Sequence, residues 1–411
     1  MPAPSSPIVF EHLPAHRPGL RIAVVTETWP PEVNGVATTL ARFVDGLRAR
    51  HHDIQLIRPR QPGIDDASVR PDDSQVLVNG WSIPRYPALK MGLPARQSLT
   101  RLWSTRRPDL VHVVTEGPLG WSALQAAGRL RIPVSSDFRT NFDAYSRHYR
   151  VGWLHKPITA YLRRFHNRTR LTMVPTEAIR RELADRGFER LRVVGRGVDH
   201  RLFDPARRSQ ALRDQWGASG DAPVVLHVGR LAPEKNLPAL ASAFARIRRV
   251  TPRARLVLVG EGPAGEWLRA QCPGAVFAGM RAGEDLATHY ASGDVFLFPS
   301  LTETFGNVTL EAMASGLAVV AYRYAAAAEL IDDGHNGLLA DYDDIEQLSA
   351  LATELVAHRR LRVALGHRAR ERALRHGWEQ ATMTLEAALL SVAQAGRTDR
   401  ATGPAMMPAA S

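Results

Sequence analysis

The sequence predicts an α/β protein made of two domains, each built on a doubly wound parallel sheet. Short apolar runs alternate with helix-length amphipathic stretches along both halves of the chain. The stretch 295–322 shows the repeating unit: an apolar run, a loop carrying Glu303 and Gly306, a helix-length segment closed by Gly316, and a second apolar run. In such units ligands bind where strands end and helices begin.

The composition is that of a globular cytoplasmic protein. The chain has 411 residues, of which 45% are hydrophobic and 23% charged, which suggests two or three domains. No apolar run reaches the roughly 18 residues of a membrane span, and residues 1–20 lack the apolar core of a secretory signal. The single cysteine, Cys272, allows no internal disulfide and is expected to be a structural residue.

The net charge of +12 admits three kinds of partner: nucleic acid, an anionic membrane surface, or anionic substrates. An arginine-rich composition bias explains the charge equally well. We expect anionic substrates, with an anionic membrane surface as an additional partner, and no nucleic acid.

The N-terminal half opens with a disordered leader, 1–20, and then a strand–loop–helix–strand unit over 21–57. Its loop carries Gly35, which suits either a simple turn or a close approach to phosphate. A loop or edge region follows over 61–80. Further strands are predicted at 110–114, 133–136, 171–174 and 191–194, and further helices at 118–131 and 176–186.

The segment 145–170 mixes arginine and histidine with aromatic and aliphatic residues in an amphipathic pattern. Such a pattern is typical of a helix on anionic headgroups. It is also typical of a surface helix that packs its apolar stripe on a sheet. Both interpretations stay open.

Two glycines in 195–199 and a polar run to residue 223 predict an interdomain hinge. The predicted domains are 21–199 and 200–376, followed by a C-terminal helix over 377–395 and a disordered tail over 396–411. Strands of the second domain are predicted at 224–228, 256–259, 276–278, 295–298 and 317–322, with helices at 237–249, 308–314 and 345–355.

The strand ends of the second domain deliver chemically active residues to one edge of the sheet, namely Arg230, Lys235, Glu261, Gly279 and Glu303. Two neighbouring cations repel unless they share an anion, and a diphosphate suits them. Backbone N–H groups of 306–308, at a helix N-terminus, also favour phosphate, while carboxylates bind hydroxyls. The pattern indicates a nucleotide-sugar site. The alternative is that the cations form solvated ion pairs with Glu234 and Glu261.

These motifs resemble the retaining family 4 glycosyltransferases, also described as glycosyl transferases group 1. The motifs are GRLxxEKN (229–236), GEGP (260–263), Glu303-x7-Glu311, TWPPxxNGV (28–36) and FxxYxRHY (142–149). The N-terminal pattern is nearest to bacterial GDP-mannose-dependent α-mannosyltransferases and to sulfoquinovosyl- and glucosyl-diacylglycerol synthase-like enzymes. The resemblance covers about residues 20 to 395. It implies GT-B architecture: two Rossmann-like domains facing across a cleft, with the last helix crossing back to the acceptor-binding first domain.

The resemblance also implies residue roles. It gives catalytic roles to Arg230, Lys235, Glu303 and Arg139. It gives nucleotide-sugar binding to Gly35, Arg230, Lys235, Gly279, Met280, Glu303, Phe305, Gly306, Asn307, Val308 and Glu311. Within that set, the two cations would neutralise the diphosphate, Glu303 would bind sugar hydroxyls, and Glu311 would bind the ribose.

The implied reaction moves a hexose of the mannose or glucose type from a nucleotide-diphosphate sugar to an acceptor hydroxyl on a membrane lipid or glycolipid, with retention of configuration. No metal or other cofactor is expected, because the cations and the helix N-terminus can stabilise the leaving diphosphate. Asp341-Tyr342-Asp343-Asp344 spells a metal-binding D-x-D motif but is predicted to cap the helix at 345. The implied location is cytoplasmic, peripheral on the inner face of the membrane.

Arg139 departs from the family pattern, because relatives commonly carry histidine there. Arginine cannot act as an acceptor or base near neutral pH. The change indicates an altered sugar choice, a weakened enzyme, or another histidine serving instead, with His112 and His148 as candidates.

Other functions remain open. They are a transferase with a soluble sugar or polysaccharide acceptor, a nucleotide-sugar epimerase, and a basic membrane- or nucleic-acid-binding protein whose transferase site has decayed.

Overall fold

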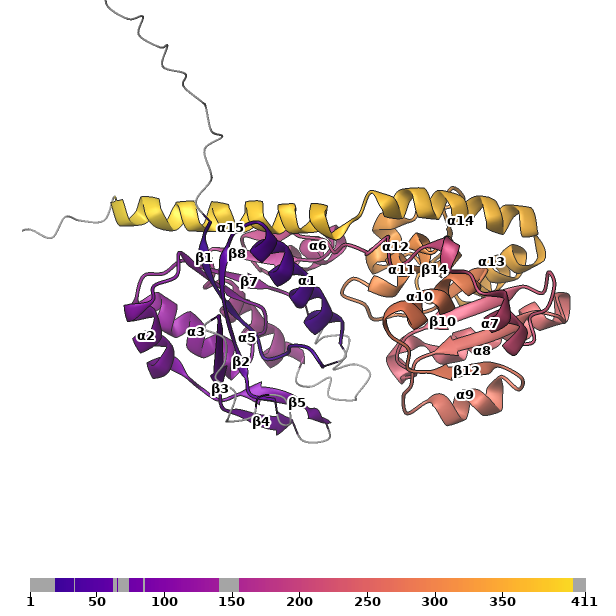
Figure 1. The fold of residues 1–411 in the computed structure, drawn as a ribbon, viewed down its shortest axis with the longest axis horizontal. Coiled ribbons are helices and arrows are strands. Elements are labelled where there is room, and N and C mark those ends of the chain that lie inside the picture. The colour runs from indigo at the N-terminus through magenta and orange to yellow at the C-terminus, as the bar shows by residue number, and fades with distance from the viewer. Residues whose placement is uncertain are drawn as a thin grey trace, which may run out of the picture.

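The computed structural model describes residues 19–32, 34–61, 65, 74–83, 86–139 and 155–401. Figure 1 shows two lobes, each a sheet covered by helices, with the long C-terminal helix α15 (Trp378–Ala401) lying along the first lobe. The two-domain α/β prediction is confirmed.

The N-terminal sheet has seven parallel strands in the order β3-β2-β1-β6-β7-β8-β9. The strands are β1 (Arg21–Val25), β2 (Asp53–Pro59), β3 (Gln75–Val78), β6 (Leu110–Val113), β7 (Val134–Asp137), β8 (Leu171–Val174) and β9 (Leu191–Val193). The helices are α1 (Gly35–Ala49), α2 (Arg96–Thr105), α3 (Pro118–Arg129), α5 (His155–His166) and α6 (Glu177–Asp185). Strands β4 (Gly80–Ile83) and β5 (Tyr86–Gly92) form a separate antiparallel pair.

The C-terminal sheet has six parallel strands in the order β12-β11-β10-β13-β14-β15. They are β10 (Val224–Val228), β11 (Arg255–Val259), β12 (Val276–Gly279), β13 (Val295–Phe298), β14 (Ala318–Tyr322) and β15 (Leu338–Ala340). The helices are α7 (Gln210–Gln215), α8 (Leu237–Val250), α9 (Gly265–Gln271), α10 (Gly283–Ser292), α11 (Asn307–Ala314), α12 (Ala325–Leu330), α13 (Ile345–Ala357) and α14 (Arg359–Leu374).

In both sheets the strand order reverses beside the first strand. The reversals lie between β1 and β6 and between β10 and β13. Ligands of doubly wound sheets bind at the carboxyl ends of the strands at this point. A ligand-binding site is therefore expected at the loops after β1, β6, β10 and β13.

Helix α15 belongs to the core of the first domain. Its buried Leu385 and Leu389 pack in the same apolar cluster as Phe43 of α1, and the Trp378 ring meets the Phe43 ring edge-on at 5.5 Å. The helix runs to Ala401, beyond the predicted end at 395, so the predicted disordered tail starts too early. In this extension Arg397 forms an exposed ion pair with Asp109 at 3.1 Å.

The leader prediction is also one residue or more too long. Leu20 is buried, and its N–H donates to His52 Nδ1 at 3.0 Å. Residues 1–18 lie outside the described part of the chain.

The chain crosses between the two domains twice, and the crossings lie side by side. Val198 N donates to the carbonyl of His376 at 2.9 Å. A Cβ on Gly197 would lie 2.5 Å from the backbone nitrogen of Trp378, so only glycine allows this approach. The predicted hinge around Gly197 thus packs tightly against the start of α15.

The basic amphipathic segment is described from residue 155 onward. Helix α5 buries Leu162 and Phe165 in the domain core and exposes Lys156, Arg163 and Arg164. Its apolar stripe therefore packs on the protein, as the surface-helix interpretation predicts. Its basic side chains stay accessible. Among the described helices, none combines the length and apolarity that a membrane crossing needs.

Candidate functional site

A cation and a carboxylate meet where β10 and β13 end. Lys235 Nζ, on the loop after β10, pairs with the carboxylate of Glu303, on the loop after β13. Ser300 Oγ donates to the same Glu303 oxygen at 2.9 Å, and Lys235 Nζ lies 5.7 Å from the centre of the Phe298 ring. Both charged side chains are largely buried, at 16% and 15% exposure. The loops at the switch point thus bring together two of the predicted residues.

Arg230 is paired differently from the prediction of two cations awaiting one anion. Its guanidinium bonds to Glu234, whose carboxylate is 3% exposed. The alternative of an ion pair with Glu234 is correct in its partner, and Arg230 is exposed as it expects, but the Glu234 carboxylate is buried. Glu234 Oε2 has no hydrogen-bond partner in the described structure, and Thr302 Oγ1 donates to the Glu234 carbonyl at 3.2 Å. The pair joins an exposed guanidinium, 43% exposed, to a buried carboxylate, one oxygen of which has no partner among the described residues.

Glycines allow the loops of β10 and β11 to touch. A Cβ on Gly260 would lie 2.0 Å from the carbonyl oxygen of Gly229, and one on Gly262 would lie 2.3 Å from that of Leu231. Both glycines have positive φ, +127° and +159°. The GEGP motif therefore supports the backbone on either side of Arg230.

The N-terminus of α11 faces the first domain. Gly306 precedes it with φ +94°, and no side chain caps the helix. Asn307, its first residue, accepts a hydrogen bond at 3.1 Å from Arg196 Nη1, and Phe305 is buried beside it. A Cβ on Gly35, at the start of α1, would lie 3.6 Å from the same Arg196 nitrogen. Predicted donor residues from both domains therefore converge at one point.

Glu311 lies one turn further along α11. Its carboxylate accepts a hydrogen bond from Tyr290 Oη at 2.9 Å, and burial raises its pKa to about 7. Val308 is half-buried on the preceding turn. A carboxyl held this way can accept hydrogen bonds from hydroxyls that enter the site.

Gly279 and Met280 end β12 at the rim of the site. Gly279 has φ +73°, Met280 is 53% exposed, and the Met280 N–H donates to Glu261 Oε1 at 3.4 Å. The exposed Met280 side chain offers an apolar surface on which a flat ring can pack, beside the Glu261 carboxylate.

His227 is a polar residue of the site that the sequence reasoning missed. It is buried in β10, and its Nδ1 lies 3.1 Å from the carbonyl oxygen of Leu297, so Nδ1 carries the proton. Burial lowers its pKa to about 4. Its Nε2 is buried and has no partner among the described residues, and in this tautomer it is an acceptor. The sequence signal was a histidine inside an otherwise apolar strand.

On the first domain, Arg139 and His112 share one carboxylate. Arg139 Nε donates to Asp137 Oδ2 at 2.5 Å, and His112 Nε2 lies 3.3 Å from the same oxygen. Burial alone would raise the pKa of Asp137, but the charges of Arg139 and His112 hold it well below its usual range. His112 Nδ1 also meets Ser135 Oγ at 2.9 Å. The structure thus places one of the two candidate histidines beside Arg139, whereas His148 lies outside the described residues.

The D-x-D sequence is a helix cap, as predicted. Asp344 accepts a hydrogen bond from the Gln347 N–H at 2.9 Å at the start of α13. In the described part of the chain, no group of three or more His, Cys, Asp or Glu side chains is placed to hold a metal ion. Cys272 is buried at the end of α9, and burial raises its pKa to about 11.

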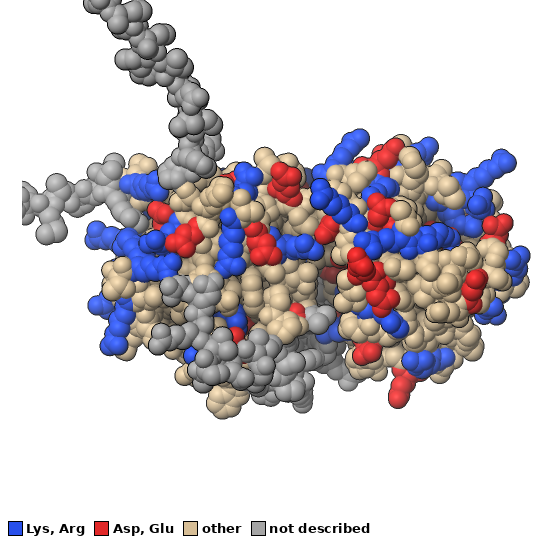
Figure 2. Space-filling model, in the orientation of Figure 1, with Lys and Arg blue, Asp and Glu red and all other residues tan. Residues whose placement is uncertain are grey.

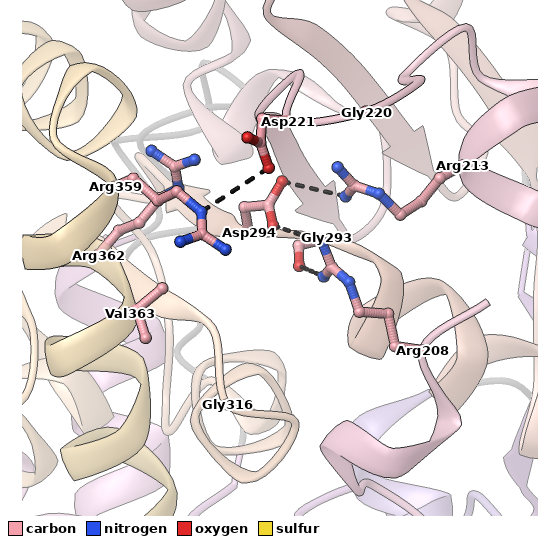
Figure 3. Close-up of a pocket in the computed structure, with 10 residues that line it drawn as sticks. All are labelled: Arg208, Arg213, Gly220, Asp221, Gly293, Asp294, Gly316, Arg359, Arg362 and Val363. Carbon is pink, nitrogen blue, oxygen red and sulfur yellow. Dashed lines mark hydrogen bonds and ion pairs between the residues drawn. The ribbon is translucent and has the colours of Figure 1, made fainter. Parts of the chain in front are cut away.

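A cavity of about 300 Å³ lies at the opposite edge of the C-terminal sheet (Figure 3). Four arginines and two aspartates line it, and the buried Arg362 donates to the Val356 carbonyl at 3.0 Å. Arg208 and Arg213 both pair with Asp294, at 2.7 and 3.0 Å, and Arg359 lies 3.9 Å from Asp221. These contacts tie α14 and the linker to the sheet, away from the strand ends that carry the site.

Comparisons with known proteins agree with this geometry. Family models described as "Glycosyl transferases group 1" and "Glycosyltransferase Family 4" match residues 222–358 and 33–202. A GDP-mannose-dependent alpha-mannosyltransferase of Corynebacterium glutamicum is 34% identical over 82% of this chain and 80% of the relative. The sulfoquinovosyl transferase SQD2 of Arabidopsis thaliana is 34% identical over 88% of this chain and 72% of the relative.

Solved structures share the fold. Anabaena HepE in complex with UDP and glucose has a TM-score of 0.70 at 20% identity, covering 90% of this chain and all of that one. The sucrose-phosphate synthase of Thermosynechococcus elongatus has a TM-score of 0.74 at 18% identity, covering 92% of this chain and all of that one. The two sheets, the converging loops and these relatives confirm the predicted GT-B fold, and the chain is a glycosyltransferase that belongs to family 4.

Proposed function

We propose that this enzyme transfers a hexose of the mannose or glucose type from a nucleotide-diphosphate sugar to a hydroxyl of a membrane lipid or glycolipid, with retention and without a metal. The observation that carries the proposal is the Lys235–Glu303 pair beside the uncapped N-terminus of α11. A cation and free backbone N–H groups suit a diphosphate, and a carboxylate beside them suits sugar hydroxyls.

Transfer requires departure of the diphosphate, on which negative charge develops. Lys235 has three N–H donors, so it can bind phosphate while it still contacts Glu303. Arg230 and the α11 N-terminus add positive potential at the same place. In the retaining reaction that we propose, the acceptor hydroxyl attacks from the face that the diphosphate leaves, and a donor phosphate oxygen takes its proton.

The other predicted residues take donor-binding roles. Glu311 accepts from ribose hydroxyls, Gly279 and Met280 border the base, and Gly35 lets the first domain approach the diphosphate. The open Nε2 of His227 accepts from a hydroxyl, since its neutral ring cannot donate there.

The lipid acceptor is supported by relatives and by surface charge. An alpha-monoglucosyldiacylglycerol synthase of Streptococcus pneumoniae is 28% identical over 82% of this chain. A phosphatidylinositol monomannoside mannosyltransferase of Mycolicibacterium smegmatis is 29% identical over 87% of this chain. Figure 2 shows lysines and arginines scattered over both lobes, with acidic residues among them. The exposed Lys156, Arg163 and Arg164 of α5 would contact anionic headgroups, which supports our proposal of a peripheral position on the inner face of the membrane.

A donor screen tests the proposal. The purified enzyme is incubated with GDP-mannose or UDP-glucose and either a lipid extract or water-soluble glycans, and products are identified by mass spectrometry. A hexose added to a lipid is the expected result. Hexose on a soluble glycan would favour the soluble-acceptor transferase, and an isomerised nucleotide sugar formed without acceptor would favour an epimerase.

A further inference from the structure

Among the residues that the structure describes, Arg196 is a buried cation that contacts no carboxylate. Arg196 lies on the linker between the domains and is 7% exposed. Its Nη1 donates to the neutral Asn307 amide oxygen at 3.1 Å, and its Nε is buried without a partner among the described residues. Its guanidinium carbon lies 5.6 Å from the centre of the Phe305 ring.

Three other cations described at this site each have a carboxylate partner. Lys235 pairs with Glu303, Arg230 with Glu234, and Arg139 with Asp137. A buried guanidinium that has only a neutral acceptor is costly, because the charge has left water without a compensating anion. Burial first, and then the like charge of Arg139, lower the pKa of Arg196 to about 9. Glu303 and Asp137 act on Arg196 in the opposite direction, but in the described part of the chain no carboxylate contacts it.

Position decides which anion fits. Arg196 touches Asn307, the first residue of α11, and lies beside Gly35, the first residue of α1. The uncapped N-terminus of α11 favours phosphate at this same place. We propose that Arg196 is a third cation for the donor's diphosphate, contributed by the interdomain linker. The proposal rests on the proposed function, because it assumes that a nucleotide-diphosphate sugar binds here.

Because Arg196 lies on the linker between the domains, a ligand bound to it would also affect how the domains are held together. The adjacent Gly197 packs on the backbone of Trp378, where the chain crosses between domains a second time. A diphosphate that bonds Arg196, Lys235 and the α11 N-terminus therefore joins the linker to the C-terminal domain. Binding of the terminal phosphate would fix the two domains relative to each other, whereas a nucleoside monophosphate would not.

Calorimetric titration with GDP and UDP, each compared with GMP and UMP, tests this role without any transfer reaction. We expect the Arg196→Gln variant to bind the preferred diphosphate about 10- to 100-fold more weakly, the loss of a hydrogen bond to a charged group. Binding of the matching monophosphate should change less than about twofold. Arg196→Lys should keep part of the diphosphate preference, and it serves as the second variant if Arg196→Gln does not fold.

Two controls separate a ligand contact from a structural strut. Asn307→Ala removes the hydrogen bond from Arg196 to α11. If Arg196 acts only by holding α11 in place, this variant should lose as much diphosphate affinity as Arg196→Gln. Arg192→Gln alters an exposed arginine of β9, bonded to Ser391 Oγ at 3.2 Å, and should change neither affinity. If Arg196→Gln keeps the wild-type ratio of diphosphate to monophosphate affinity, the role of Arg196 is overturned, whereas the proposed function is not. A wild-type protein that binds neither diphosphate would contradict the proposed function as well.

Discussion

At the scale of single residues, Arg139 is the main departure from the family pattern. It is buried and bonded to Asp137, on which His112 also converges. Histidine at 139 could still face Asp137, so we expect Arg139→His to preserve or raise kcat/KM. Arg139→Ala leaves a buried carboxylate with His112 alone and should destabilise the protein by about 3 kcal/mol. Steady-state kinetics and urea unfolding check the two variants. A large loss of activity in Arg139→His would show that arginine has a specific role there.

Glu311 gives a pH-dependent prediction. Its pKa is raised to about 7 in the folded protein by burial, so the folded state prefers the neutral form. The stability it contributes is full below its unfolded pKa of about 4.5 and is lost as pH rises through about 7. Glu311→Gln removes this dependence. The unfolding free energy of Glu311→Gln minus that of the wild type should rise by about 3 kcal/mol between pH 4 and pH 8.

Urea unfolding of both proteins at the two pH values measures this difference. If the difference in unfolding free energy between wild type and Glu311→Gln is the same at pH 4 and pH 8, the raised pKa of Glu311 is contradicted. Tyr290→Phe is the matched control, because it removes the hydrogen-bond donor and leaves the carboxyl buried.

The residues found from sequence were those in dense motifs. Lys235 and Glu303 were predicted because strand ends of a parallel sheet share one edge, and the structure pairs them. Arg196 and His227 were not predicted. Arg196 lies in a linker, where spacing along the chain carries no information on which loop it meets. The role of His227 depends on burial and a carbonyl contact that only the folded chain supplies.

At the scale of elements, the loop after β11 supports the loop that carries Arg230. Gly260→Ala would place a Cβ 2.0 Å from the Gly229 carbonyl oxygen at φ +127°. We expect it to destabilise the protein by at least about 1 kcal/mol and to lower kcat/KM by more than tenfold. Gly128→Ala, in α3 with nothing within 4 Å, is the control and should be neutral or stabilising by up to about 1 kcal/mol. If Gly260→Ala and Gly128→Ala have the same stability and the same kcat/KM, the loop after β11 does not support the Arg230 loop.

Helix α15 is expected to stabilise the first domain. Leu385 is 2% exposed in the core shared with α1, whereas Met383 of the same helix is 43% exposed. Leu385→Ala should cost about 2–5 kcal/mol of unfolding free energy, and Met383→Ala less than about 1 kcal/mol. Chemical denaturation of both variants measures the difference. If both variants lose less than about 1 kcal/mol of unfolding free energy, α15 does not unfold cooperatively with the first domain.

The buried strands were the best-predicted elements, because parallel strands covered on both faces are continuous apolar runs. Strands β10 and β13 match their predicted ranges residue for residue. Helix α2 and the β4–β5 pair were missed, since this region is polar and rich in proline and the pair lies outside both large sheets.

At the scale of the whole molecule, the loops at the switch points of the two sheets come into contact. Arg196, Gly35 and Asn307 come from the linker, the first domain and the second domain, and they meet within hydrogen-bonding or van der Waals range. Sequence reasoning predicted the two domains from alternation alone. The contact between them could not be predicted, because it depends on how the paired chain crossings orient the lobes.

The most direct test of the central claim is hexose transfer by the wild type and by Lys235→Ala, assayed with the same donor and acceptor. Lys235 binds the leaving diphosphate in this account, so its removal should lower kcat/KM by about 10²- to 10³-fold. Arg253→Ala, which changes net charge equally at an exposed turn of the same domain, should leave kcat/KM within about twofold. Wild-type activity in Lys235→Ala would contradict the account.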